Sequence, residues 1–209
     1  MAQTALQIYI ALMMTIRSRL DVIESLSKLS GNDFSRAETA AFHGRKVIEG
    51  ICFACLVATE NGLKHVPRDA KGQWNAEKIL QSLESKGIPT LPSPSIIREA
   101  SSSERETDRV KAVIEGIPER RISHYDLIAI YQSLHRWLHE INPYTEPNHN
   151  LFFTKHGQSL WDDLVRINRF IEKHFISISG EGYFCVLRDN VDGSTKVMPL
   201  SRQSSNMIG

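Results

Sequence analysis

A nearly continuous apolar stretch at residues 47–58, VIEGICFACLVA, constrains the fold more than any other feature of this sequence. If it forms a helix, every face is hydrophobic apart from Glu49, and such a helix belongs in a core with other helices packed around it. The stretch is too short to cross a lipid bilayer. We therefore expect a central helix over residues 36–61, which begins at a capping box in residues 35–38 (SRAE) and ends at the Asn-Gly pair of residues 61–62.

Two charged side chains, Arg45 and Glu49, lie four residues apart on this expected helix and so share one face. A buried carboxylate needs a partner, and Arg45 is the nearest candidate. The pair fits two interpretations, a structural ion pair that fixes helix packing or the floor of a functional cleft. Gly44 and Gly50 weaken a helix by roughly 1 kcal/mol each relative to Ala, so we expect a neighbouring helix to approach closely there.

Amphipathic patterns predict further helices around the central one. Apolar residues recur at spacings of three and four, and Ser, Thr or Asn stands at the start of each segment as a candidate N-cap. We expect helices over residues 4–30, 75–87, 103–116, 123–142 and from 159 to about 174. Residues 88–95 carry three prolines and are expected to be extended or irregular, and residues 144–157 are expected to form a loop.

The periodicity changes near the C-terminus. Residues 183–188 (YFCVLR) and 196–200 (KVMPL) flank a turn that contains Asp192-Gly193, a pattern typical of a β-hairpin. Pro199 confines its strand to a sheet edge. The expected fold is therefore all-α, a helical bundle of about six helices with a C-terminal β-hairpin. We expect two parts: residues 1–178 form the helical bundle domain, and residues 179–209 form the hairpin appendage and a flexible tail.

Composition narrows the class of protein. The chain has 209 residues, a net charge of +1 and 23% charged residues, which is ordinary for a globular protein and unlike a basic or acidic disordered tail. Three cysteines and no convincing signal peptide favour the cytoplasm, and no membrane association is expected. Cys52 and Cys55 have redox spacing but lie in the apolar stretch, where a thiolate is hard to form, so we interpret them as core side chains.

His135 and His139 are the strongest candidate site residues, because their spacing places both imidazoles on one helix face. Metal binding, packed or exposed surface histidines, and general acid–base catalysis all fit this pair. The HExxH form is absent and no third ligand is evident, so we expect no metal and no cofactor. Arg136 could hold a phosphate or stabilise an oxyanion, and Tyr131 is expected either in the core or as a cleft partner of Glu49.

This combination of features resembles the HEPN superfamily. The resemblance covers roughly residues 4–175 and consists of an all-helical bundle with Arg and His near helix ends and an Arg-x-x-x-Glu in a central apolar helix. It implies a compact helical domain of a kind that is often an RNA-cleaving toxin or defence protein and often dimeric. The hallmark of the family is an arginine separated by four to six residues from a histidine, both acting on RNA across the dimer.

Two residue pairs match that hallmark, Arg36 with His43 and Arg169 with His174, whereas the site-like cluster around His135 has a different spacing. The leading hypothesis is a cytoplasmic, homodimeric, metal-independent endoribonuclease. In it, His139 or His135 takes the 2′-hydroxyl proton and Arg136 or Arg45 stabilises the phosphorane.

The arginine pair Arg120 and Arg121 is either solvated surface or an RNA-binding element. The alternative function is a non-catalytic interaction or scaffold module, such as a sensor or antitoxin-like partner in a larger complex.

Overall fold

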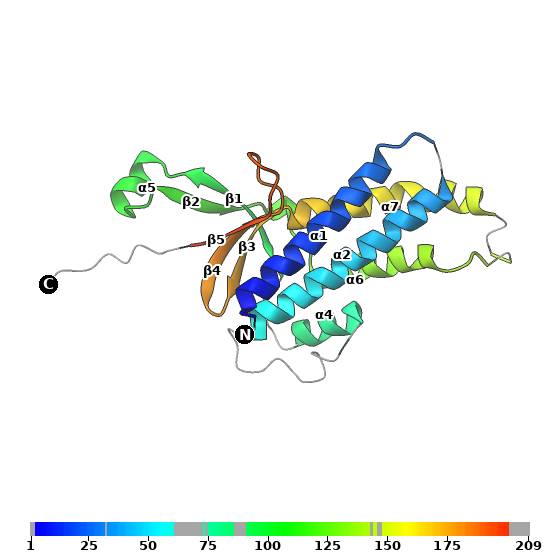
Figure 1. The fold of residues 1–209 in the computed structure, drawn as a ribbon, viewed down its shortest axis with the longest axis horizontal. Coiled ribbons are helices and arrows are strands. Elements are labelled where there is room, and N and C mark those ends of the chain that lie inside the picture. Colours follow the sequence, from blue (N-terminus) through cyan, green and yellow to red (C-terminus); the bar gives the residue numbers. More distant parts are fainter. Residues whose placement is uncertain are drawn as a thin grey trace.

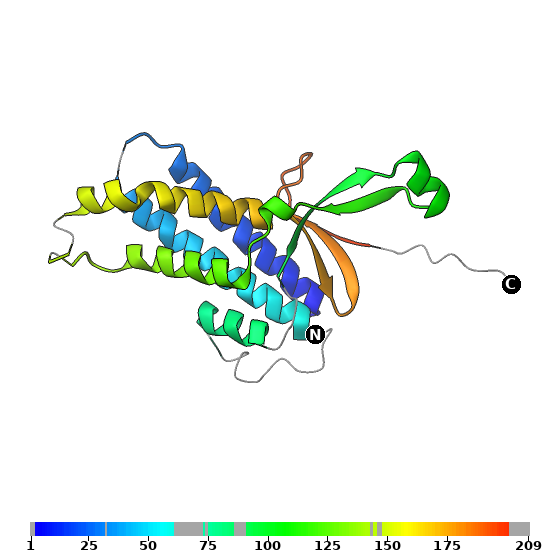
Figure 2. The same cartoon turned by 180° about the vertical axis from the view of Figure 1, so that it is seen from behind.

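The central helix is present as α2 (Phe34–Glu60), and α1 (Ala5–Ser27), α4 (Ala76–Ser85), α6 (His124–His135) and α7 (His149–Ile171) all contact it. Figures 1 and 2 show these long helices at one end of the molecule and a sheet at the other. The computed structural model describes residues 3–31, 33–60, 73, 75–85, 91–142, 144–145 and 148–200. The expected end of the central helix at residues 61–62 and the expected flexible tail lie outside these residues.

The apolar stretch of α2 forms the middle of the hydrophobic core, as predicted. Ile51 and Cys55 have no exposed surface, and Leu56 is 6% exposed. The close approach expected at a glycine is also confirmed, because a Cβ added to Gly44 would lie 2.3 Å from the Cδ2 atom of Leu164 on α7. A glycine at this position leaves the space that the Leu164 side chain occupies against α2.

The predicted N-caps are confirmed at three helices and wrong at α2, α5 and α7. Thr4 forms a capping box with Gln7 at the start of α1, and the side chains of Asn75 and Ser123 cap α4 and α6. The expected box at residues 35–38 is incorrect. Asp33 takes this role, because its carboxylate accepts the Ser35 N–H at 2.9 Å and the helix begins at Phe34.

The prediction of an all-α fold is wrong, because a five-stranded antiparallel sheet accompanies the six α-helices of the described residues. The strand order is β2-β1-β3-β4-β5. The strands are β1 (Ser93–Glu99), β2 (Ala112–Gly116), β3 (Lys173–Ile178), β4 (Glu181–Val186) and β5 (Lys196–Pro199). The predicted hairpin is confirmed as β4 and β5, with Pro199 on an edge strand. The division expected between residues 178 and 179 falls at the turn between β3 and β4, two strands that pair along their whole length.

The charged helix expected over residues 103–116 is incorrect. Only α5 (Ser102–Thr107) forms, capped by Ser101 and Glu104. Arg109 then takes a left-handed conformation, with φ +54°, which ends the helix. The apolar residues that follow form β2 and pair with β1. Their β-branched side chains therefore lie in a strand and not along the apolar edge of a helix.

The last two helices also differ from expectation. α6 ends at His135 and continues only as the 3-10 turn η2 (Arg136–Leu138), while a second such turn, η1 (Pro118–Arg120), precedes it. α7 begins ten residues earlier than expected, because Asn148 caps it by accepting the Leu151 N–H at 3.0 Å. None of the described helices has the length and apolar character needed to cross a membrane.

Candidate functional site

Five side chains meet where the end of α6 lies against α2, and we call them the histidine–arginine cluster. Arg45 and Glu49 come from one face of α2, Tyr131 and His135 from one face of α6, and His139 from the chain after η2. Residues four apart on a helix lie one above the other, so two helical pairs facing each other produce the cluster. The sequence pairs Arg45/Glu49 and His135/His139 were predicted separately, and the structure brings them together.

The inner half of the cluster is a hydrogen-bonded ion pair. The Arg45 Nε atom lies 3.3 Å from the Glu49 Oε1 atom, and the Lys46 Nζ atom lies 2.7 Å from Glu49 Oε2. An Arg45 Nη2–H donates to the Tyr131 hydroxyl at 2.7 Å, and that hydroxyl donates to Glu49 Oε1 at 3.3 Å. The Glu49 side chain is only 14% exposed, so these partners offset the cost of burying its charge.

The outer half of the cluster is the histidine pair. Arg45 also contacts the Nδ1 atom of His135, and the Nε2 atoms of His135 and His139 lie 2.8 Å apart. A guanidinium can only donate, so His135 Nδ1 accepts and its ring proton is on Nε2. That N–H then donates to the Nε2 atom of His139. Arg45 therefore sets the tautomer of both imidazoles.

The charge state of His135 follows from its surroundings. Partial burial, the Arg45 guanidinium and the neighbouring His139 together hold the pKa of His135 below its ordinary value. The neutral imidazole therefore predominates near pH 7. Both rings lie at the surface, so a bound substrate can reach their nitrogen atoms.

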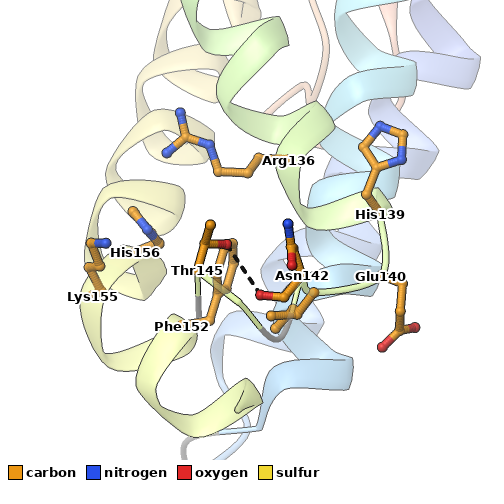
Figure 3. Close-up of a pocket in the computed structure, with 9 residues that line it drawn as sticks. Arg136, His139, Glu140, Asn142, Thr145, Phe152, Lys155 and His156 are labelled. Carbon is orange, nitrogen blue, oxygen red and sulfur yellow. Dashed lines mark hydrogen bonds between the residues drawn. The ribbon is translucent and has the colours of Figure 1, made fainter. Parts of the chain in front are cut away.

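Arg136 lies next to this cluster in sequence but points away from it. Figure 3 shows that the Arg136 side chain extends from α6 toward α7, whereas the His139 ring lies on the opposite side, toward α2. A pocket of about 360 Å³ lies between α7 and the chain that continues from α6 through η2. Its lining residues are Arg136, His139, Glu140, Ile141, Asn142, Thr145, Phe152, Lys155 and His156. We call this the α6–α7 pocket.

No protein-family model, characterised protein or solved structure matches this chain. The candidate site therefore rests on its geometry and chemistry.

Arg120 and Arg121 are not part of either feature. They lie at η1, before α6, whereas the cluster lies at its far end, and a twelve-residue helix is about 18 Å long. The Arg120 Nη1 atom forms an ion pair with Glu172 at 3.7 Å. Their expected role in RNA binding at the same site has no geometric support.

The two sequence pairs that match the family hallmark occupy other places. His174 lies in β3 with no exposed surface, where its Nε2 atom is 2.7 Å from the Tyr9 hydroxyl, and burial lowers its pKa to about 4. Arg36 contacts backbone carbonyls at the end of α1, and the Nδ1 atom of His43 lies 3.5 Å from Arg19. Neither pair joins the histidine–arginine cluster.

Sequence reasoning missed Lys155 and His156, because residues 144–157 were expected to form a loop. Asn148 followed by apolar residues at helical spacing was the available signal for an earlier helix start. The cysteines are as expected, since Cys52 and Cys55 are fully buried and burial raises the pKa of Cys52. Within the described residues, no three His, Cys, Asp or Glu side chains gather as a metal site.

Proposed function

We propose that the protein is a HEPN-like, metal-independent endoribonuclease that cleaves RNA by transesterification at the histidine–arginine cluster. The observation that carries the proposal is the surface pair of imidazoles whose protonation pattern is set by Arg45, itself held by Glu49. Such a pair supplies a proton acceptor and a hydrogen-bond donor that are close enough to contact the same hydroxyl group. RNA carries the nucleophile for this chemistry in its own 2′-hydroxyl, so no metal-bound water is needed.

A 2′-hydroxyl group that displaces the hydrogen bond between the two Nε2 atoms can donate to His139 and accept from His135. His139 Nε2 takes its proton while the 2′-oxygen forms a bond to phosphorus. The bond from phosphorus to the 5′-oxygen breaks, and His139 passes the proton to that leaving oxygen. The products are a 2′,3′-cyclic phosphate and a 5′-hydroxyl, and the protein is unchanged.

The other members of the cluster support this step without touching the reacting atoms. Arg45 is a positioning residue, because it fixes the His135 tautomer and places positive charge behind the developing phosphorane. Glu49 and Tyr131 hold the guanidinium in place. Figure 3 places Arg136 on the other side of α6, so we do not assign it to stabilising the phosphorane.

Cleavage of single-stranded RNA by the purified protein with EDTA present tests the proposal. We expect His139→Ala to lower the rate by about 10²–10⁴-fold, the usual contribution of general acid–base catalysis, and His135→Ala to lower it as well. His43→Ala is the matched control, since this α2 histidine faces Arg19 and not the cluster. Circular dichroism checks that each variant is folded. Unchanged cleavage in both His135→Ala and His139→Ala would remove the site assignment.

The wider biological assignment follows from the resemblance and the composition. A toxin or defence role, action as a homodimer and a cytoplasmic location are part of the proposal.

The alternative function, a non-catalytic interaction module, is favoured by one different observation. β1, α5 and β2 form an arm that extends away from the helices (Figures 1 and 2). Arg98 braces this arm through Glu104 at 2.8 Å and Glu115 at 2.7 Å. Ile96 and Ile97 on β1 are 39% and 44% exposed. A wild-type protein that binds a protein partner through this arm and leaves RNA intact would support this function over the nuclease.

A further inference from the structure

We infer that the α6–α7 pocket binds an RNA phosphate next to the scissile one, which makes single-stranded RNA of three or more nucleotides the preferred ligand. This inference rests on the proposed function, because it names a second subsite for the same substrate. His139 belongs to both the α6–α7 pocket and the histidine–arginine cluster. A strand that crosses the end of α6 can therefore contact the two at once.

The charge of the pocket fits a phosphate. Arg136 comes from η2 and Lys155 from α7, so cations line it from two sides, and His156 adds a third basic group. Figure 3 shows the Arg136 side chain extending toward α7, the helix that carries Lys155 and His156. Arginine and lysine are the usual phosphate ligands of proteins, and arginine binds two oxygens at once.

Arg136 is available for a ligand. Among the residues that the structure describes, no hydrogen bond or ion pair holds its guanidinium. Among the described lining residues Glu140 is the one carboxylate. It lies apart from Arg136 in Figure 3, and its Oε1 atom is 3.7 Å from the Nε2 atom of His149. An exposed arginine whose charge is not neutralised by a neighbour is well suited to bind an anion.

The shape of the pocket is compatible with a nucleotide. A volume of about 360 Å³ is within the range of small-ligand sites. Phe152, 6% exposed, and Ile141 provide an apolar floor. The Thr145 hydroxyl donates to the Asn142 carbonyl at 3.2 Å, and both residues line the pocket (Figure 3).

Binding of uncleavable RNA tests this subsite separately from catalysis. Oligonucleotides with 2′-O-methyl groups lack the nucleophile, so calorimetry with a dinucleotide and a trinucleotide measures affinity alone. We expect the wild-type protein to bind the trinucleotide about tenfold more tightly than the dinucleotide. Arg136→Ala and Lys155→Ala should remove that difference, and each should lower the salt dependence of binding by about one phosphate contact.

Two controls sharpen the result. Lys28→Ala removes an exposed lysine that pairs with Glu24 on α1 and should leave the trinucleotide affinity unchanged. Arg136→Lys keeps the charge and should restore part of the affinity. Equal affinities for the two oligonucleotides, or affinities unchanged in Arg136→Ala and Lys155→Ala, would overturn the subsite. Binding that depends on the pocket in a protein that cleaves no RNA would support the subsite and refute the nuclease.

Discussion

The Nε2 atoms of His135 and His139 lie 2.8 Å apart, within hydrogen-bonding distance, on the surface of a helical bundle. Only one of the two can carry the proton between them while both rings are neutral. Because Arg45 contacts the Nδ1 atom of His135, the proton is on His135, and His139 presents a lone pair. This asymmetry gives the two histidines different roles in the proposed reaction and leads to predictions that do not depend on observing RNA cleavage.

Removing Arg45 should change the titration of His135. In Arg45→Ala the like charge beside Nδ1 is gone, so we expect the pKa of His135 to rise toward its ordinary value. Proton NMR titration of the His135 ring measures this directly. Arg45→Lys retains a positive charge, but a lysine ammonium group cannot contact Glu49, Tyr131 and His135 at once as the planar guanidinium does. The His135 ring proton should therefore no longer be confined to Nε2. A His135 pKa that is the same in Arg45→Ala as in the wild type would contradict the assigned contact.

Glu49 should contribute more to stability than an exposed acid. Glu49→Gln leaves Arg45 and Lys46 without their carboxylate partner in a mostly buried setting, and we expect a loss of about 2 kcal/mol in the free energy of unfolding. Glu24→Gln, which breaks the exposed pair with Lys28 and a longer one with Arg188 at 3.9 Å, should cost less than about 0.5 kcal/mol. Urea denaturation of both variants gives the comparison. Equal losses in the two variants would show that the ion pair of Glu49 stabilises the protein no more than the exposed ion pair of Glu24.

Stability should fall in mild acid because of His174. Its pKa is about 4 in the folded protein and 6.5 as the ordinary value, so between these pH values the unfolded chain binds a proton that the folded chain excludes. The free energy of unfolding therefore decreases as pH falls from 6.5 to 4, by about 3 kcal/mol from this residue. His174→Leu removes the titrating group. Its stability should vary less with pH in this window, and an undiminished pH dependence would show that other groups are responsible.

The contact between α2 and α7 should not tolerate a methyl group at Gly44. A Cβ there would lie 2.3 Å from Leu164 Cδ2, so in Gly44→Ala the buried Leu164 side chain must leave its position or the helices must separate, and the free energy of unfolding should fall by about 1–3 kcal/mol. Combining it with Leu164→Ala relieves the clash, so the double variant should lose less stability than the sum of the two single variants. If the double variant instead loses as much stability in thermal unfolding as the two single variants together, Gly44 and Leu164 are not in contact.

Local sequence signals predicted most of the bundle and the separate pairs of the site. The apolar stretch of α2, the caps at Thr4, Asn75 and Ser123, and the C-terminal hairpin are all properties of short segments. Strands β1, β2 and β3 were missed because their identity depends on pairing with distant segments. The apolar residues in 112–116, for example, fit the edge of an amphipathic helix as well as they fit a strand, and only their pairing with β1 decides between the two.

The candidate site shows the same limit. Each pair is four residues apart in the sequence, so spacing alone suggested Arg45 with Glu49 and His135 with His139, although α6 ends at His135 and His139 follows the η2 turn. The contact between Arg45 and His135 joins positions 90 residues apart and depends on how α2 packs against α6. Arg136 points away from the cluster because adjacent residues on a helix do not share a face. The η2 turn ends the continuous helix that was expected through residue 142.

Cleavage of a DNA oligonucleotide that contains a single ribonucleotide tests the central claim most directly. If the 2′-hydroxyl is the nucleophile, the protein with EDTA present should cut only on the 3′ side of that ribonucleotide, leaving a 2′,3′-cyclic phosphate, and His139→Ala should not. The same oligonucleotide with deoxyribose at that position should remain intact. An intact ribonucleotide substrate, or equal cleavage of the all-DNA strand, would contradict the account.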